Sequence, residues 1–165
     1  SHTADVRLLH TDRPDPNSEL DAKFSVQYCV ARALLDGRVS LKHFDEPALR
    51  EPALQTLLAR VHATPHLDGQ FEPGQGFAAE VKVTLKDGSA VSSRVIRPLG
   101  RTSANPIPPE QLKAKFVDCA ASVLPAAQVS AAADALDRFE IVASVREFMR
   151  LLEVSGTQVA QRKTA

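Results

Sequence analysis

The chain has 165 residues, of which 44% are hydrophobic and 24% charged, the composition of a globular protein rather than a disordered one. Its 20 basic and 20 acidic side chains cancel, so no excess of positive charge favours binding to nucleic acid. No apolar run approaches the length of a membrane span and no signal-peptide pattern precedes the first polar residues, so we expect a soluble cytoplasmic protein.

The first predicted elements are a short strand and a long helix. Residues 5–10, DVRLLH, form an apolar run that suits a strand. A loop rich in Pro and Asp follows, and Asn17 or Ser18 is expected to cap the next helix. That helix is predicted to contain residues 22–37, AKFSVQYCVARALLDG, and to end at Gly37, which suits the left-handed position after a helix.

This predicted helix is apolar on two opposite faces. At about 100° per residue, one apolar stripe contains Phe24, Tyr28, Ala31 and Leu35. The opposite stripe contains Val26, Cys29, Val30 and Ala33. The polar seams between the two stripes contain Lys23 and Gln27 on one side, and Ser25 and Arg32 on the other. An ordinary surface helix has a single apolar face. We therefore expect one side of this helix to lie on its own sheet and the other against something else.

The middle of the chain predicts two short helices and then a β-hairpin. Glu46-Pro47 and Glu51-Pro52 are typical helix starts, with proline at the first helical position. A strand is predicted over residues 61–64. Residues 66–76, which are rich in glycine, are predicted to form an exposed loop. Residues 78–98 alternate as a hairpin does around Asp87-Gly88. A three-residue loop with Gly88 as the bulge pairs Val83 with Val91, and the hydrophobic pattern favours this register over a two-residue loop.

After the proline-rich connector at residues 101–109, the pattern is helical. Three apolar stripes follow, made by Leu112, Phe116, Cys119, Ala120 and Val123, by Val129, Ala132, Leu136 and Phe139, and by Val145, Phe148, Met149 and Leu152. We predict an α+β fold, with a small antiparallel sheet and packed helices over residues 1–124, and a helical C-terminal tail over residues 125–165. The last residues, 157–165, are expected to fray. The tail either packs back on the first part or completes a helical body that this chain lacks, and we favour the second alternative.

Spacing alone identifies no catalytic motif. The sequence has no phosphate-binding loop, no nucleophile elbow and no zinc-ligand spacing. Pro65 separates His62 from His66, so we interpret both histidines as surface-loop residues. Cys29 and Cys119 are expected to be buried thiols in a reducing compartment. Asp134, Asp137 and Glu140 are interpreted as a solvated helix face.

Tyr28, the chain's only tyrosine, has two interpretations. It is either a core aromatic whose hydroxyl reaches a backbone carbonyl, or an acid at a cleft, with Lys23 and Ser25 near the helix start to hold an anion. Spacing alone favours the core interpretation.

The order of motifs resembles the MmgE/PrpD family, which includes 2-methylcitrate dehydratase, cis-aconitate decarboxylase and iminodisuccinate epimerase. The segment FSVQYCVARALLDG is similar to the family helix FSxxYxxAxALxxG, HFDEPALREP to FxxxxLxxP, and VKVTLKDG to the family hairpin. GRTSANPIPPEQLKAKF is similar to a segment in which Asn-Pro precedes ExLxxKF. The resemblance spans nearly the whole chain, but only the C-terminal part of the family's polypeptide.

The resemblance implies a fold and an activity. Family members join a large helical domain to a smaller α+β lid, so this chain would be the lid plus the last helices. They act without metal or redox cofactor on small di- or tricarboxylates, by proton abstraction next to a carboxylate and then dehydration, decarboxylation or epimerisation. The motif match places Tyr28 as the catalytic lid tyrosine, with Lys23 and Ser25 as substrate-binding residues.

The resemblance also implies partners. These are the polycarboxylate substrate, the helical domain of the same protein and a second copy in a homodimer, with neither nucleic acid nor a membrane. The family's principal histidines and its other catalytic lysine lie upstream of this part, so we expect the isolated chain to have little or no turnover. The alternative is a non-catalytic α+β interaction module that self-associates through an exposed apolar face.

Overall fold

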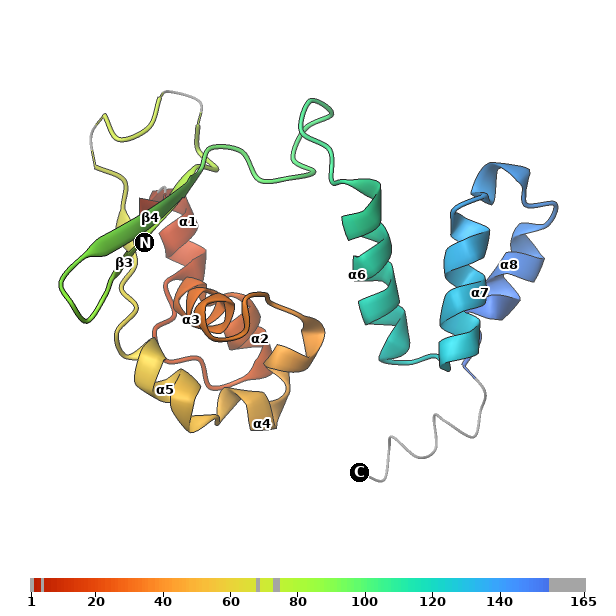
Figure 1. Ribbon diagram of the computed structural model, residues 1–165, viewed down its shortest axis with the longest axis horizontal. Helices are drawn as coiled ribbons and strands as arrows, with labels where there is room; N and C mark the ends of the chain where they lie inside the picture. The colour runs from red at the N-terminus through yellow and green to blue at the C-terminus, as the bar shows by residue number, and fades with distance from the viewer. Residues whose placement is uncertain (1, 4, 68, 73–74, 155–165) are drawn as a thin grey trace. The chain divides into compact units, whose positions relative to one another are not determined.

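The computed structural model describes residues 2–3, 5–67, 69–72 and 75–154 (Figure 1). It separates into two compact units, Ser1–Pro106 and Ile107–Ala165, each with its own hydrophobic cluster. The first unit combines helices with a small sheet and the second is helical, so the predicted α+β fold with a helical tail is confirmed. These compact units divide at 106/107, because the helix that follows the connector packs on the next helix along the chain. The expected boundary at 124/125, between a lid and helices that join another domain, stays a prediction.

The N-terminal run that we predicted as a strand is a helix. Strand β1 (His2–Thr3) comes before it, and the run itself forms α1 (Asp5–Thr11). The prediction was wrong because a short apolar run fits both periodicities. Ser18 caps the next helix, α2 (Glu19–Lys23), as expected, since its Oγ accepts a hydrogen bond from the backbone N–H of Asp21 at 3.1 Å.

The long predicted helix is broken before its tyrosine. Helix α2 ends at Lys23, and α3 (Val26–Asp36) begins after Ser25, whose Oγ accepts from the backbone N–H of Tyr28 at 3.0 Å. A serine oxygen that caps a helix competes with continuation of the preceding one, which explains the break. Gly37 ends α3 with a φ of 70°, as predicted.

The expected division of α3 into two apolar faces holds only in part. The core side buries Tyr28 and Ala31 together with Gln27 and Arg32, two residues that we had placed on polar seams. Of the predicted Tyr28 stripe, Phe24 is 50% and Leu35 41% exposed. Burial of the two polar side chains follows from tertiary hydrogen bonds, which helical periodicity does not report.

Three short helical segments close the core of the first unit. They are the 3₁₀ segment η1 (Leu41–Phe44), α4 (Glu46–Leu49) and α5 (Pro52–Leu58). The two predicted helix starts are confirmed, with prolines in the first turns. The buried cluster comprises Ala22, Tyr28, Ala31, Phe44, Leu49, Leu54 and Leu58, with Cys29, Leu57 and Val61 packed against it.

The sheet has the strand order β2-β1-β3-β4, in which β2 is Thr64–Pro65, β3 is Ala79–Thr84 and β4 is Ala90–Val95. Val83 pairs with Val91, which confirms the predicted register. The loop closes with hydrogen bonds from Leu85 N to Ser89 O at 2.8 Å and from Gly88 N to Leu85 O at 3.1 Å. Gly88 has a φ of 85°, the left-handed conformation that the bulge requires.

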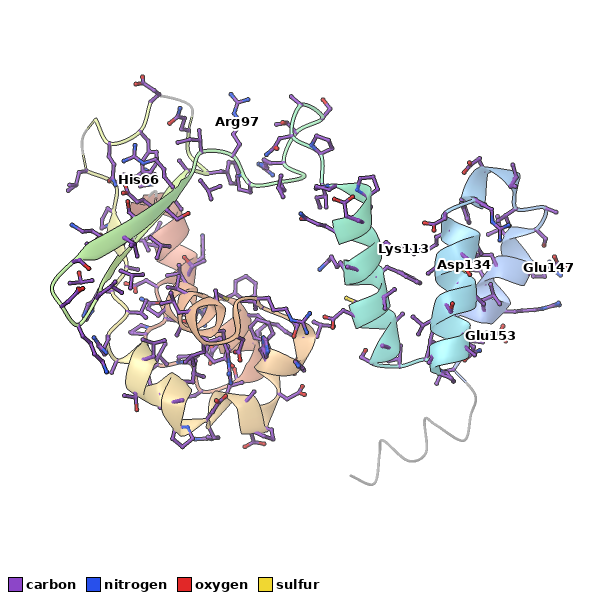
Figure 2. All side chains as sticks on the ribbon, in the orientation of Figure 1. His66, Arg97, Lys113, Asp134, Glu147 and Glu153 are labelled. Atoms are coloured by element: carbon purple, nitrogen blue, oxygen red, sulfur yellow. The ribbon has the colours of Figure 1, made fainter. Side chains whose placement is uncertain are left out.

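The second unit is built from α6 (Pro109–Ala121), α7 (Ala126–Leu136), the 3₁₀ segment η2 (Phe139–Ile141) and α8 (Val145–Leu151). Among its described residues, those buried are Ala120, Leu124, Val129, Ala132, Ala133 and Phe148. On the solvent side, Lys113 lies 4.0 Å from Asp134 and also pairs with Asp137, as expected for a solvated helix face (Figure 2). Among the described helices, none has the length and apolarity to cross a membrane. The predicted fraying over 157–165 lies outside the described residues.

Candidate functional site around Tyr28

Tyr28 lies in the middle of the first unit's core. Its side chain is completely buried, and its ring centroid is 5.7 Å from that of Phe44. The hydroxyl donates a hydrogen bond to the carbonyl oxygen of His43 and faces Nε of Arg32 at 3.4 Å. Both the proton and a lone pair of the phenol are therefore engaged by groups of this chain.

Arg32 extends this contact into a buried ionic network. Only 2% of Arg32 is exposed, and its guanidinium donates to Glu51 at 2.6 Å, to Asp36 at 3.2 Å and to the carbonyl of Ala48. Burial lowers the pKa of the Arg32 guanidinium, but hydrogen bonds to Tyr28 and Glu51 outweigh burial and leave that pKa above its ordinary value. The guanidinium thus ties α3 to α4 and to the residue that precedes α5.

His43 completes the group of polar side chains, which we call the Tyr28 polar cluster: Tyr28, Arg32, Asp36, His43 and Glu51. The Nδ1 atom of His43 accepts from the backbone N–H of Ser40 at 3.1 Å, so the proton of the neutral ring belongs on Nε2. Nε2 lies 3.9 Å from Asp36 Oδ2. The ring is 7% exposed, so the cluster is nearly closed to solvent on the histidine side.

The other two predicted site residues have different surroundings. Ser25 is 1% exposed, and its hydroxyl donates to the carbonyl of Arg13 at 2.6 Å while capping α3 through the N–H of Tyr28. Lys23 is partly exposed, forms an ion pair with Glu19 at 2.6 Å, and places its Nζ 5.8 Å from the ring centroid of Phe44. The structure therefore joins Ser25 and Tyr28 through one hydrogen bond and leaves Lys23 at the surface.

These contacts match the core interpretation of Tyr28 in its chemical detail, including the backbone carbonyl acceptor. A role as proton donor stays a prediction, and it requires the hydroxyl to exchange His43 for a substrate atom. Ser25 would likewise have to release Arg13 before it could donate to a carboxylate. Lys23 needs only to leave an exposed partner, which is inexpensive in water.

Sequence reasoning missed the charged members of the cluster. Arg32 was assigned to a seam and His43 was given no role, although Tyr28, Arg32 and Asp36 follow one another at helical spacing of four residues. This i, i+4, i+8 pattern of hydrogen-bonding residues was the available signal. Glu51 could not be found in this way, since it comes from a segment 19 residues further along the chain. For the neighbouring thiol, burial raises the pKa of Cys29, in line with an unreactive core cysteine.

A separate groove of about 450 Å³ lies between α3, α5 and β3. Its lining is mainly aliphatic, with cationic and polar residues also present: Val30, Leu34, Leu57, Arg60, Val61, His62, Val81, Lys82, Val83, Thr84, Leu85 and Lys86. None of Lys23, Ser25 and Tyr28 is part of this lining. The groove is therefore not the anion site that the sequence predicted around the start of α3.

The two loop histidines have different surroundings, since His62 lines the groove and His66 contacts the segment before β3. His66 places Nε2 3.0 Å from the carbonyl of Ala78, and its ring centroid lies 4.2 Å from that of Phe71 (Figure 2). These contacts fix the loop to the start of β3. Within the described part of the chain, no group of three or more His, Cys, Asp and Glu side chains is arranged to hold a metal ion.

Comparisons with known proteins agree with the order of motifs in the sequence. The family model of the MmgE/PrpD C-terminal domain matches residues 1–140. Cis-aconitate decarboxylase from Mus musculus is 27% identical over 151 residues, which cover 92% of this chain and 30% of that protein. The Homo sapiens enzyme of the same name is 31% identical over 109 residues, 66% of this chain and 22% of that protein. The Aspergillus terreus enzyme is 28% identical over 141 residues, 83% of this chain and 28% of that protein. The chain thus spans less than a third of the length of these curated relatives.

Proposed function

The chain belongs to the MmgE/PrpD family, and from this membership we propose that it is the C-terminal lid portion of a lyase or isomerase that acts on a small di- or tricarboxylate. The observation that carries the proposal is the family match across residues 1–140, together with similarity to cis-aconitate decarboxylases from two mammals and a fungus. The similarity to these decarboxylases makes cis-aconitate the first substrate to test.

The proposed reaction needs a base, an acid and cationic groups. Abstraction of a proton next to a carboxylate builds negative charge, which hydrogen-bond donors and cations stabilise, before water or carbon dioxide leaves or the carbon is reprotonated. We assign Tyr28 as the acid or hydrogen-bond donor, and Lys23 and Ser25 as carboxylate-binding residues. Lys23 is the most accessible of the three, because Tyr28 and Ser25 are buried in this structure.

The base is assigned to a helical domain of the same protein, which we propose as the partner of this chain. Support comes from the apolar side chains that the first unit leaves at its surface, among them Phe24 at 50%, Leu34 at 47% and Leu35 at 41% exposure. A helix with such residues on its outer side is suited to cover by a second body. We also propose that the intact protein is a homodimer.

The test compares the isolated chain with the full-length protein. We expect the full-length protein to convert cis-aconitate or 2-methylcitrate, and the isolated chain to show no turnover, because it lacks the base. Product formation is followed by NMR, which reports dehydration, decarboxylation and epimerisation in one experiment. Robust turnover by the isolated chain would contradict the assignment of the base to another domain.

The role of Tyr28 is tested in the full-length protein with Tyr28→Phe. If the phenol acts on the substrate, kcat falls about 10²- to 10⁴-fold, the range for loss of a positioned proton donor. Phe44→Leu serves as the control, because it disturbs the same core and keeps the hydroxyl. Equal, small losses in the two variants would assign Tyr28 to the core alone.

The enclosure of Tyr28 favours one alternative, a non-catalytic interaction module. In that case the full-length protein converts none of the polycarboxylates tested, while the apolar surface of the first unit still binds a protein partner.

A further inference from the structure

The groove between α3, α5 and β3 continues the position of β1 in the sheet. Strand β1 lies between β2 and β3, with His2 opposite Thr64 on one side and opposite Glu80 on the other. The groove is lined by residues 60–62, which precede β2, and by residues 81–86, which follow Glu80. Its two walls are therefore the continuations of the strands that flank β1. The groove has the place of one strand in the sheet, beyond the end of β1.

Strand β3 turns unpaired backbone groups toward this groove. The backbone N–H of Leu85 bonds across the hairpin at 2.8 Å, and bonded positions alternate along an antiparallel pair, so Val83 also bonds across to β4. The backbone groups of Lys82 and Thr84 therefore point away from β4. On that side, no described strand pairs with β3 beyond Glu80. Such open N–H and C=O groups can accept a further strand.

One side of the groove is aliphatic. Val81 and Val83 are only partly buried, and they line the groove together with Val30 and Leu34 of α3 and Leu57 of α5. Side chains alternate between the two faces of a strand, so a strand in this place would turn every second side chain toward these residues. The groove thus offers both backbone partners and an apolar wall.

We propose that the residues preceding Ser1 in the intact protein continue β1 through this groove and complete the sheet. Strand β1 runs antiparallel to β3, so the positions before His2 along the chain lie opposite the positions after Glu80. The incoming segment therefore follows the open side of β3 and lies between it and the residues that precede β2.

The pairing of His2 with Glu80 fixes the register of this segment. The first residue before Ser1 lies opposite Lys82 and the third lies opposite Thr84, and both exchange backbone hydrogen bonds with β3. The second and fourth residues before Ser1 carry the side chains that face α3 and α5. These two residues are predicted to be apolar, and polar residues at both positions in the preceding coding sequence would contradict the register.

The direction of β1 favours this occupant over a peptide from another protein. The polypeptide reaches His2 from the groove side, so a separate peptide would compete with it for the same backbone groups. The chain spans 30% or less of the three curated relatives, which leaves sequence for the intact protein to supply this strand. The inference rests on the proposed function only where that makes the chain part of a longer protein, and it does not depend on catalysis.

The first experiment compares amide hydrogen exchange, at residue resolution, in the isolated chain and in the full-length protein. We expect the amides of Lys82 and Thr84 to exchange about tenfold or more slowly in the full-length protein, because each gains a hydrogen bond. The amide of Val83 is the internal control, since it bonds to β4 in both proteins. Equal exchange of Lys82 and Thr84 in the two proteins, relative to Val83, overturns the proposal.

A second experiment adds the predicted strand alone. The chain is extended by about five of its natural preceding residues, the length of a typical strand. We expect a higher melting temperature than for the parent chain. A Gly-Ser extension of the same length is the control and should give no increase, because it has no side chains to pack. No increase from the natural extension, or an equal increase from the control, overturns the proposal.

A matched pair of substitutions in the natural extension tests the register. Aspartate in place of the second residue before Ser1 should abolish the increase, because it would bury a charge against α3 and α5. Aspartate in place of the first residue before Ser1 lies on the other face and should keep most of the increase. Equal effects contradict the register. None of these measurements uses activity, so failure here leaves the proposed lyase function standing, and an inactive full-length protein leaves this inference standing.

Discussion

The two units of the chain are stabilised in different ways. Around Tyr28 the first unit buries charged and polar groups, including Arg32 and His43, and satisfies them through hydrogen bonds to α4 and the flanking segments. The described core of the second unit consists of aliphatic and aromatic side chains, many of them alanines, while its ion pairs at Lys113 lie in solvent.

Because of this difference, the two units should be sensitive to different kinds of substitution. Polar groups that are buried and paired fix one arrangement of their partners, because any other arrangement leaves donors or acceptors unsatisfied. A core of small apolar side chains depends on shape and volume alone. We therefore expect polar substitutions to harm the first unit and volume changes to harm the second.

The largest effect is expected for Arg32→Met. This change removes the donors to Tyr28, Glu51 and Asp36 and leaves carboxylates facing an apolar side chain. The free energy of unfolding should fall by about 3 kcal/mol, at the low end for a broken buried ion pair because both carboxylates are partly solvated. Urea denaturation measures the loss, and hydrogen exchange should show that it is confined to the first unit. An equal loss of exchange protection in both units would contradict this separation.

Phe148→Ala is the corresponding change in the second unit. Phe148 is 9% exposed and meets Phe139 edge to face, with ring centroids 5.3 Å apart. Its truncation should cost about 2 kcal/mol, below the value for a central phenylalanine because one edge of the site can relax toward solvent. Hydrogen exchange in α7 and α8 reports the effect. Unchanged protection there would mean that the unit is not held by this side chain.

Two serine caps give a matched pair with a smaller difference. Ser25 is buried, caps α3 and also donates a hydrogen bond to the carbonyl of Arg13. Ser144 caps α8 only, through a longer contact of 3.3 Å between its Oγ and the backbone N–H of Glu147. Ser25→Ala should cost about 1–2 kcal/mol and Ser144→Ala about 0.5 kcal/mol. Chemical denaturation of the two variants side by side checks the order, and the reverse order would refute the contrast between the units.

Lys113→Ala should have the smallest effect, because its ion pairs are fully hydrated. The hydrogen bond to Asp137 raises the pKa of Lys113, so the folded chain holds this proton more tightly than the unfolded chain. The resulting stabilisation is complete below the ordinary lysine pKa of about 10.4 and is lost as the pH rises through the higher folded value. The difference between the melting temperatures of parent and variant should therefore shrink as the pH is raised above the ordinary lysine pKa, and a difference that does not change with pH in this range would exclude this ion pair as its source.

Local signals in the sequence were sufficient for several parts of the structure. The hairpin register followed from alternation and from Gly88, and the caps at Ser18 and Gly37 followed from residue chemistry. Such features depend on neighbours a few residues away, so the sequence contains the information that they need. The α+β class and the family membership were predicted from the same local patterns and motifs.

The Tyr28 polar cluster could not be predicted in this way. Periodicity placed Tyr28 on an apolar stripe and Arg32 on a seam, but it could not show that both turn to the same core. Their partners, His43 and Glu51, come from other segments, and their contacts form only when η1 and the start of α5 pack against α3. Nor could periodicity show that a six-residue apolar run would form α1 rather than a strand.

The amino-acid sequence by itself determined the elements with strong local signals, their caps, the hairpin register and the family. Only the tertiary structure decided which polar side chains are buried and in which order the strands pair in the sheet. The physical reason is that hydrogen bonds and burial depend on contacts between segments far apart in the chain. For Tyr28, those contacts enclose the hydroxyl and bond it to a backbone carbonyl, as the core interpretation expects, while its catalytic role stays a prediction.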